Sequence, residues 1–243
     1  ISCHCHSKEN KHMPKLAFFL LSALAVFSLP SHAAEIGTVS CDALNPNPHI
    51  IFKTSYGQLV HDISTPQHQI QAMSSRPEKG ILIDGLATAT TLGSIRINTA
   101  HGIKISDNDY CIIPDEIEVY FGYSNPTIYV AKEYPVDSCR FSLIIRHEQT
   151  HQRINILTMQ YFLPIIRSAA EKIIRQARSV KISTPTDDQL ALALLQRYYA
   201  IKLMPIIEKF NLAREQEHQK LDNSTNYAME YDICNKFEQT TGE

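Results

Sequence analysis

Two histidines and a glutamate stand at a spacing that suits metal chemistry. The segment His147-Glu148-Gln149-Thr150-His151 has the form HExxH. On a helix, residues four positions apart lie on one face, so His147 and His151 can present two imidazole nitrogens to one metal ion. Zinc accepts nitrogen and oxygen ligands, and Glu148 can then act as general base on a water molecule. The motif predicts a zinc-dependent hydrolase with His147 and His151 as ligands and Glu148 as the catalytic residue.

The residues before the motif predict that it lies in a buried helix. Phe141, Ile144 and Ile145 have the spacing of an apolar helix face that leads directly into the motif. Two histidines and a glutamate would be costly to bury without a metal ion to pair them. The alternative is a chance occurrence of the pattern, and the apolar context favours the metal site.

A catalytic zinc site of this type needs a third protein ligand. The polar cluster from Glu215 to Asp222, late in the last long predicted helix, is its expected source. We prefer His218, which follows His151 by 67 residues, with Asp222 one helical turn later as an acceptor for the other N–H of a histidine ligand. Asp222 or Glu215 can instead bind the metal, and a solvated helix face is the alternative for the whole cluster. Tyr227 is a candidate donor to a tetrahedral intermediate, or else a packed surface residue.

The order of these motifs resembles a bacterial family of predicted secreted zinc-dependent proteases. That family has a β-rich first half with a cysteine on a strand, a HEQ-x-H segment, and a helix that bears Tyr-Asp-x-x-Thr. The corresponding segments are Cys111-Ile112-Ile113, His147-Glu148-Gln149-Thr150-His151 and Leu221-Asp222-Asn223-Ser224-Thr225. Leu221 replaces the family's aromatic residue, and Tyr227 stands where a histidine is expected, which raises Asp222 as a candidate ligand. The resemblance covers most of residues 45 to 230 and implies a peptidase.

The first half of the chain has the alternation of a one-faced sheet. Ile117, Val119 and Phe121 alternate with polar residues, and similar short runs recur over a β-rich region, 45–135. Turn signals such as Gly93 and His101-Gly102 separate these runs. We therefore expect an antiparallel or mixed sheet of short strands.

The second half, residues 138–235, has the periodicity of helices. Asp137 or Ser138 can cap the helix that carries the motif, and Pro164 should break or kink it. Everything beyond the cap is expected to be helical apart from a loop near 183–186. The predicted fold is therefore α+β and zincin-like, with a sheet followed by a helical half that carries the HExxH helix.

The beginning of the chain has the features of an export signal. Three lysines precede an apolar run from Leu16 to Leu29, and a small-residue stretch follows, with cleavage expected after Ala33. We expect residues 1–33 to be a signal peptide, with translation starting at Met13, and residues 34–243 to form a single domain without a stable membrane span. The predicted location is the bacterial periplasm or the exterior.

Four cysteines remain after that cleavage: Cys41, Cys111, Cys139 and Cys234. In an oxidising compartment an even number favours two disulfides, for which three pairings exist. We favour Cys111 with Cys139 and Cys41 with Cys234, and buried free thiols are the alternative.

The formal charge of −2 gives no indication of nucleic-acid binding. The expected partner is a peptide or protein substrate, and the sequence does not determine the oligomeric state. The alternative function is a non-catalytic zinc-binding structural protein of the envelope. A closed site of His147, His151, His218 and Asp222 would favour that function, because it leaves no position for water.

Overall fold

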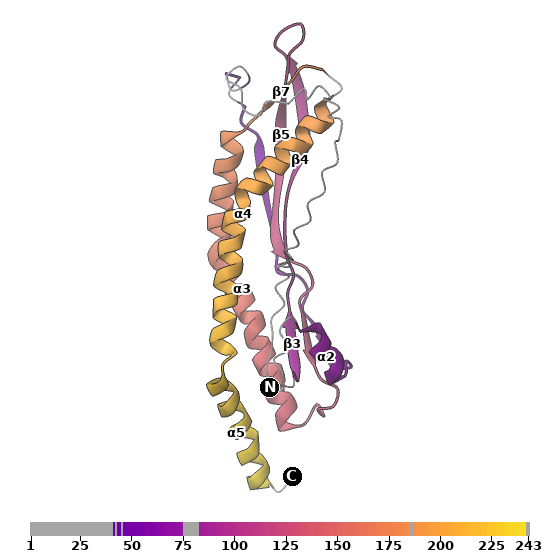
Figure 1. Cartoon of the computed structure of the whole chain (residues 1–243), viewed down its shortest axis with the longest axis vertical. Coiled ribbons are helices and arrows are strands. Elements are labelled where there is room, and N and C mark those ends of the chain that lie inside the picture. Colours follow the sequence, from indigo (N-terminus) through magenta and orange to yellow (C-terminus); the bar gives the residue numbers. More distant parts are fainter. Residues whose placement is uncertain (1–40, 42, 45, 75–82, 185–186, 242–243) are drawn as a thin grey trace, which may run out of the picture.

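The protein combines strands in its first half with long helices in its second (Figure 1). The computed structural model describes residues 41, 43–44, 46–74, 83–184 and 187–241. The predicted signal peptide, residues 1–33, lies outside the described residues. The elements are β1 (His49–Ser55), β2 (Val60–Asp62), α2 (Gln67–Met73), β3 (Gly85–Thr88), β4 (Thr91–Lys104), β5 (Tyr110–Tyr123), β6 (Thr127–Val130), α3 (Cys139–Gln176), β7 (Val180–Ile182), α4 (Asp188–Leu221) and α5 (Ser224–Thr241). This order confirms the predicted α+β class.

The described residues form two sheets, and both are mixed. In the larger sheet β5 pairs in parallel with β1 and antiparallel with β4 and β7. In the smaller sheet the order is β2-β6-β3, with β2 parallel and β3 antiparallel to β6. The prediction allowed an antiparallel or a mixed sheet, and the structure has the mixed kind. Strand β3 lies at an edge of the smaller sheet.

The prediction of short strands separated at Gly93 and Gly102 was wrong. Both glycines lie inside β4, which runs unbroken beside β5 from Thr91 to Lys104. A Cβ on Gly93 would lie 3.7 Å from the Phe121 ring, and one on Gly102 would lie 3.4 Å from Ile112. Both are ordinary contact distances, so a side chain would fit at either glycine. The long pairing with β5 holds the chain extended through them.

Helix α3 begins where the sequence predicted but does not break at Pro164. The Ser138 hydroxyl accepts a hydrogen bond from the Phe141 N–H at 3.1 Å, so Ser138 is the N-cap. The helix then continues through Pro164 to Gln176. Pro164 and Gln160, whose carbonyl loses its helical donor, are both exposed, so water can replace the missing hydrogen bond.

The expectation that everything after the cap is helical apart from one loop was also wrong at β7. This three-residue strand pairs with the beginning of β5, between α3 and α4. Val180 and Ile182 are buried there, because they extend the apolar face of the larger sheet. A run of three residues is too short for periodicity to separate a strand from a loop.

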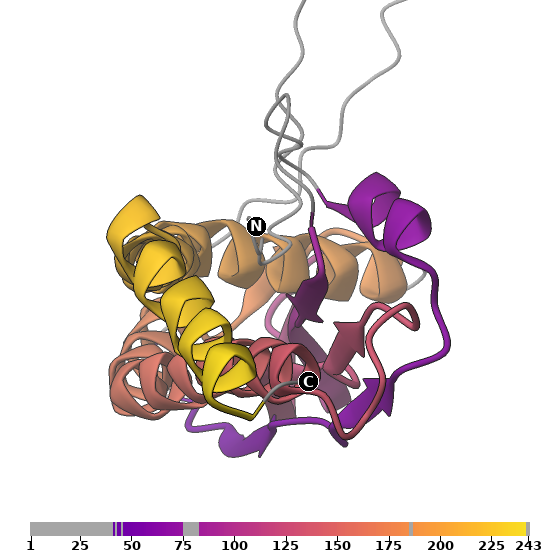
Figure 2. The ribbon, with the colours of Figure 1, turned by 90° about the horizontal axis from the view of Figure 1, so that it is seen from below.

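Helices α3 and α4 lie side by side and pack against the larger sheet (Figures 1 and 2). Phe210 of α4 makes edge-on ring contacts with Phe121 of β5 and Phe162 of α3. By length and composition alone α4 is apolar enough to cross a membrane. In this structure it contributes to the main core, which includes Ile117, Val119, Phe121, Tyr123, Met159, Ile166, Ile174, Leu195, Tyr199 and Phe210.

The predicted disulfide pairing was wrong. Cys41 is bonded to Cys111, and Cys139 to Cys234, with Cα–Cα distances of 5.7 and 5.6 Å. Cys111 lies at the beginning of β5 and Cys139 at the beginning of α3, and these points are near opposite ends of the elongated molecule (Figure 1). The disulfides point to an oxidising, extracytoplasmic environment, because such bonds are rare in the reducing cytosol.

Candidate metal centre

The two histidines of the HExxH motif lie together on α3. The fractional exposure of His147 is 3% and that of His151 is 0%. Because they are one helical turn apart, their rings lie on the same face, and their Nε2 atoms are 3.1 Å apart. The motif helix therefore presents two imidazole nitrogens at one point, as the sequence predicted.

Asp222 brings a carboxylate to the same point. Its Oδ1 atom lies 3.1 Å from His147 Nε2 and 2.9 Å from His151 Nε2. Asp222 is the C-cap of α4, and its N–H donates to the His218 carbonyl at 2.9 Å. The turn between α4 and α5 thus directs this carboxylate towards α3, and three potential ligand atoms converge.

The spacing of these three atoms fits a small metal ion. Zinc ligands at about 2.0–2.2 Å in a tetrahedral shell stand about 3.4 Å from one another. To bind zinc, the atoms would have to move apart from the observed separations of 2.9 to 3.1 Å by only a few tenths of an ångström. Two imidazole nitrogens and a carboxylate oxygen are a donor set that zinc accepts in catalytic sites.

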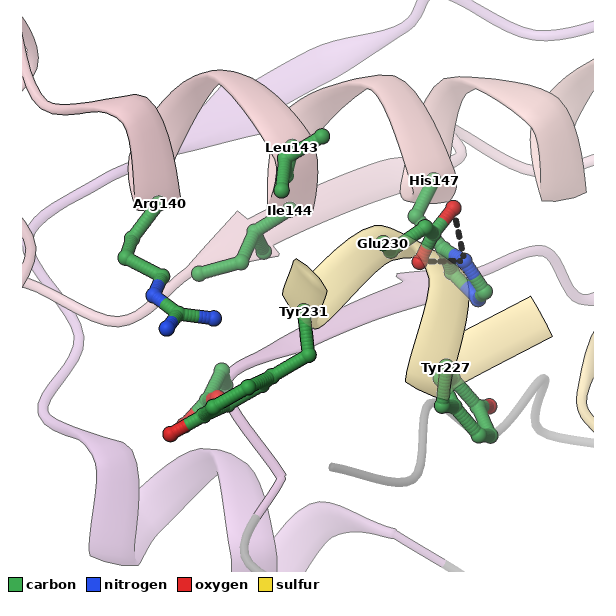
Figure 3. A pocket seen from close by; sticks show the side chains of 8 residues that line it. Arg140, Leu143, Ile144, His147, Tyr227, Glu230 and Tyr231 are labelled. Carbon is green, nitrogen blue, oxygen red and sulfur yellow. Dashed lines mark hydrogen bonds and ion pairs between the residues drawn. The ribbon is translucent and has the colours of Figure 1, made fainter. Parts of the chain in front are cut away.

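The hydrogen bonds of His147 also favour a cation at this point. Its Nδ1 atom lies 3.1 and 3.3 Å from the two Glu230 carboxylate oxygens (Figure 3). A neutral His147 that donates from Nδ1 to Glu230 directs its Nε2 lone pair at the Asp222 oxygen. That contact is favourable only with a proton or a metal ion between the two atoms.

The pKa values of the centre reflect the same pairing. Burial acts to lower the pKa of His147, but hydrogen bonds to Asp222 and Glu230 outweigh it and raise the pKa to about 9. Burial acts to raise the pKa of Asp222, but hydrogen bonds from His147 and His151 hold it below its ordinary value. Asp222 is therefore ionised at neutral pH and attracts positive charge to the site.

His218, preferred as third ligand from the sequence, lies beside the three converging atoms rather than among them. Its Nδ1 atom is 2.8 Å from His151 Nδ1, and its Nε2 atom is 3.0 Å from Asn155 Oδ1. Asn155 in turn donates to Gln152 at 3.2 Å. Burial, together with the charges of His151 and Arg214, lowers the pKa of His218 to about 3. A neutral His218 can donate from Nε2 to Asn155 and accept at Nδ1 from His151.

Tyr227 lies at the centre, on the first turns of α5. Its hydroxyl donates to Asp222 Oδ1 at 2.6 Å, and its ring stacks on that of His147 with centroids 5.4 Å apart. The candidate role from the sequence required this side chain to lie near the motif. The structure places it there, in contact with both His147 and Asp222.

Glu148 is fully buried against β3. A Cβ built on Gly85 would lie 2.8 Å from Glu148 Oε1 and 2.5 Å from Ile144. Only a residue without a side chain lets β3 pass this close to α3. Glu148 is also near enough to raise the pKa of His147. The general-base candidate therefore lies between the motif histidines and the edge strand of the smaller sheet.

Sequence reasoning missed three residues of the site: Asn155, Glu230 and Gly85. Asn155 continues the His147–His151 series at the same four-residue interval, and that periodicity could have indicated it. Glu230 comes from a different helix and Gly85 from a strand, so no local pattern relates them to the motif. Glu215, the other ligand candidate, hydrogen-bonds Gln219 on the exposed side of α4.

Comparison of the chain with protein-family models, with curated proteins and with solved structures returns no match. The resemblance to secreted zinc-dependent proteases therefore stays a prediction that rests on the motifs alone.

Proposed function

We propose that this protein is a zinc-dependent hydrolase that cleaves peptide bonds outside the cytoplasm, with a zincin-like arrangement around the HExxH helix. The observation that carries the proposal is the convergence of His147 Nε2, His151 Nε2 and Asp222 Oδ1. We assign these three as ligands and His218 as a hydrogen-bond acceptor behind His151. This reverses the preference drawn from the sequence. The two disulfides support the extracytoplasmic part of the proposal.

When bound, zinc would polarise the scissile carbonyl and make water a better nucleophile at neutral pH. Glu148 would accept the proton of the attacking water and pass it to the leaving amine as the C–N bond breaks. Its neighbour β3, an edge strand of the smaller sheet, offers a place where an extended peptide could align. Tyr227, whose single O–H donates to Asp222 in this structure, would turn that O–H to the negative oxygen that develops on the carbonyl.

The alternative is a non-catalytic zinc-binding envelope protein. It requires a closed shell of four protein ligands, in which His218 would join the other three. The contact between His218 and the far nitrogen of His151 favours a shell of three protein ligands. A shell of three leaves a position for water, so it favours the hydrolase.

The test is to measure metal content and peptidase activity together in the protein from Ala34 onward, purified from a bacterial periplasm. We expect about one zinc per chain in the wild type and in Glu148→Gln, with peptide cleavage lost only in Glu148→Gln. Glu171→Gln is the matched control, because Glu171 is also on α3 but distant from the motif. Zinc-loaded wild type that cleaves neither peptides nor denatured proteins would contradict the hydrolase.

A further inference from the structure

A small cavity adjoins the candidate metal centre between the first turns of α3 and helix α5. Leu143 and Ile144 line it on the α3 side and Tyr231 on the α5 side, with Arg140 at its far end (Figure 3). His147, Tyr227, Glu230 and Asp84 also line it, so the cavity reaches His147, one of the three converging residues. A group held in this cavity would therefore lie next to His147, one of the three assigned ligands.

The size of the cavity is restrictive. Its volume is about 30 Å³. One water molecule needs about 10–15 Å³ of such space, and a cavity of about 150 Å³ holds benzene. An alanine methyl group therefore fits, whereas a leucine or phenylalanine side chain does not. The aliphatic side chains of Leu143 and Ile144 make the inner surface suited to an apolar group.

The walls of the cavity are held together at the end distant from the centre. The Cys139–Cys234 disulfide links α3 to α5 there. The Arg140 guanidinium stacks on the Tyr231 ring at 3.6 Å and donates to Asn235 Oδ1 at 2.8 Å. These three links join the same two helices, so widening the cavity would require breaking packed contacts. Its small size should therefore select among substrates.

We infer that this cavity receives the side chain of the residue next to the scissile bond and restricts the substrate to peptides with alanine or glycine there. This inference rests on the proposed peptidase function. It adds a substrate class that the convergence of ligands alone does not give. Leu143 and Ile144 are then residues that determine specificity and take no part in the chemical step.

The experiment is to incubate the zinc-loaded full-length protein with a diverse peptide library and to identify the cut sites by mass spectrometry. We expect alanine or glycine on one side of nearly every cut. Leucine and phenylalanine at that position should be disfavoured by about 10-fold or more in kcat/KM. If bulky residues occur as often as alanine and glycine on both sides of the cut, the inference is overturned while the peptidase function stays intact. No cleavage at all would overturn both.

A variant pair tests the wall directly. Leu143→Ala should enlarge the cavity and raise kcat/KM for leucine at the restricted position relative to alanine by about 10-fold. Leu157→Ala removes the same side chain from an exposed position of α3 and should leave the ratio unchanged. A folded Leu143→Ala protein with the wild-type ratio would overturn the assignment of this cavity. If Leu143→Ala does not fold, the wild-type cut sites still decide the inference.

Discussion

The Nδ1 atoms of His151 and His218 lie 2.8 Å apart, so one proton joins the two rings. For His151 to present Nε2 to a metal ion, this proton must be on its own Nδ1, and His218 must accept it. Asn155 favours that arrangement, because its carbonyl oxygen accepts the His218 Nε2–H at 3.0 Å. The chain from His151 to Asn155 thus fixes the tautomer of a proposed ligand.

We predict that His218→Leu weakens zinc binding by about 10–100-fold, the usual effect of losing a hydrogen-bond partner behind a metal-binding histidine. Asp222→Ala should weaken it much more, because it removes a ligand. Competition with a chelating dye measures both affinities, and His101→Leu is a control at an exposed histidine. Equal losses in His218→Leu and Asp222→Ala would instead make His218 a ligand, as the sequence first suggested.

Tyr227→Phe should lower kcat by about 100-fold while the zinc content stays near that of the wild type. The variant keeps the ring that stacks on His147 and removes only the hydroxyl that donates to Asp222. Steady-state kinetics on one cleaved peptide gives kcat and KM separately. Tyr161→Phe, on an exposed part of α3, is the control. An unchanged kcat would show that the hydroxyl takes no part in catalysis.

Gly85→Ala should destabilise the fold by about 1–3 kcal/mol, because the added methyl group would overlap Ile144 and Glu148. Gly93→Ala is the matched control in β4, since its methyl group would lie at an ordinary contact distance from Phe121. Urea unfolding monitored by circular dichroism gives both free energies. Equal stabilities of the two variants would contradict the close approach of β3 to α3.

Asp84 should make the stability of the protein depend on pH. Burial raises its pKa above the ordinary value, against the opposing effect of hydrogen bonds from Tyr134 and Gln67. The folded protein therefore holds this proton more tightly than the unfolded chain, so stability falls as the pH rises from about 4, the ordinary value, through the raised pKa. We expect the free energy of unfolding of Asp84→Asn, relative to that of the wild type, to be greater at pH 7 than at pH 4. A wild type and a variant with parallel pH profiles would contradict this.

The parts of the fold that the sequence predicted are those set by local periodicity. The cap at Ser138, the helical motif and the alternation of Ile117, Val119 and Phe121 each depend on neighbours within one or two turns or along a single strand. The continuity of β4 through Gly93 was missed, because it depends on pairing with β5, which no pattern within β4 reveals.

In the candidate site, too, the sequence predicted local relationships and missed those between distant segments. His147, Glu148 and His151 are neighbours on one helix, so their spacing alone predicted that they lie together. The choice between His218 and Asp222 depended on where α4 ends, since the turn that follows it rotates the Asp222 carboxylate towards α3. The disulfide pairing likewise depended on which cysteines lie at the same end of the elongated molecule, and the order of cysteines along the chain does not encode that.

The long chain separation of the converging atoms gives the candidate centre a thermodynamic role. Asp222 follows His151 by 71 residues and His147 by 75, and all of α4 lies between them. An unfolded chain cannot hold these three atoms together, so an ion bound by all of them binds only the native state. Its binding energy is then added to the free energy of unfolding, and a chelator should lower the melting temperature as well as any activity.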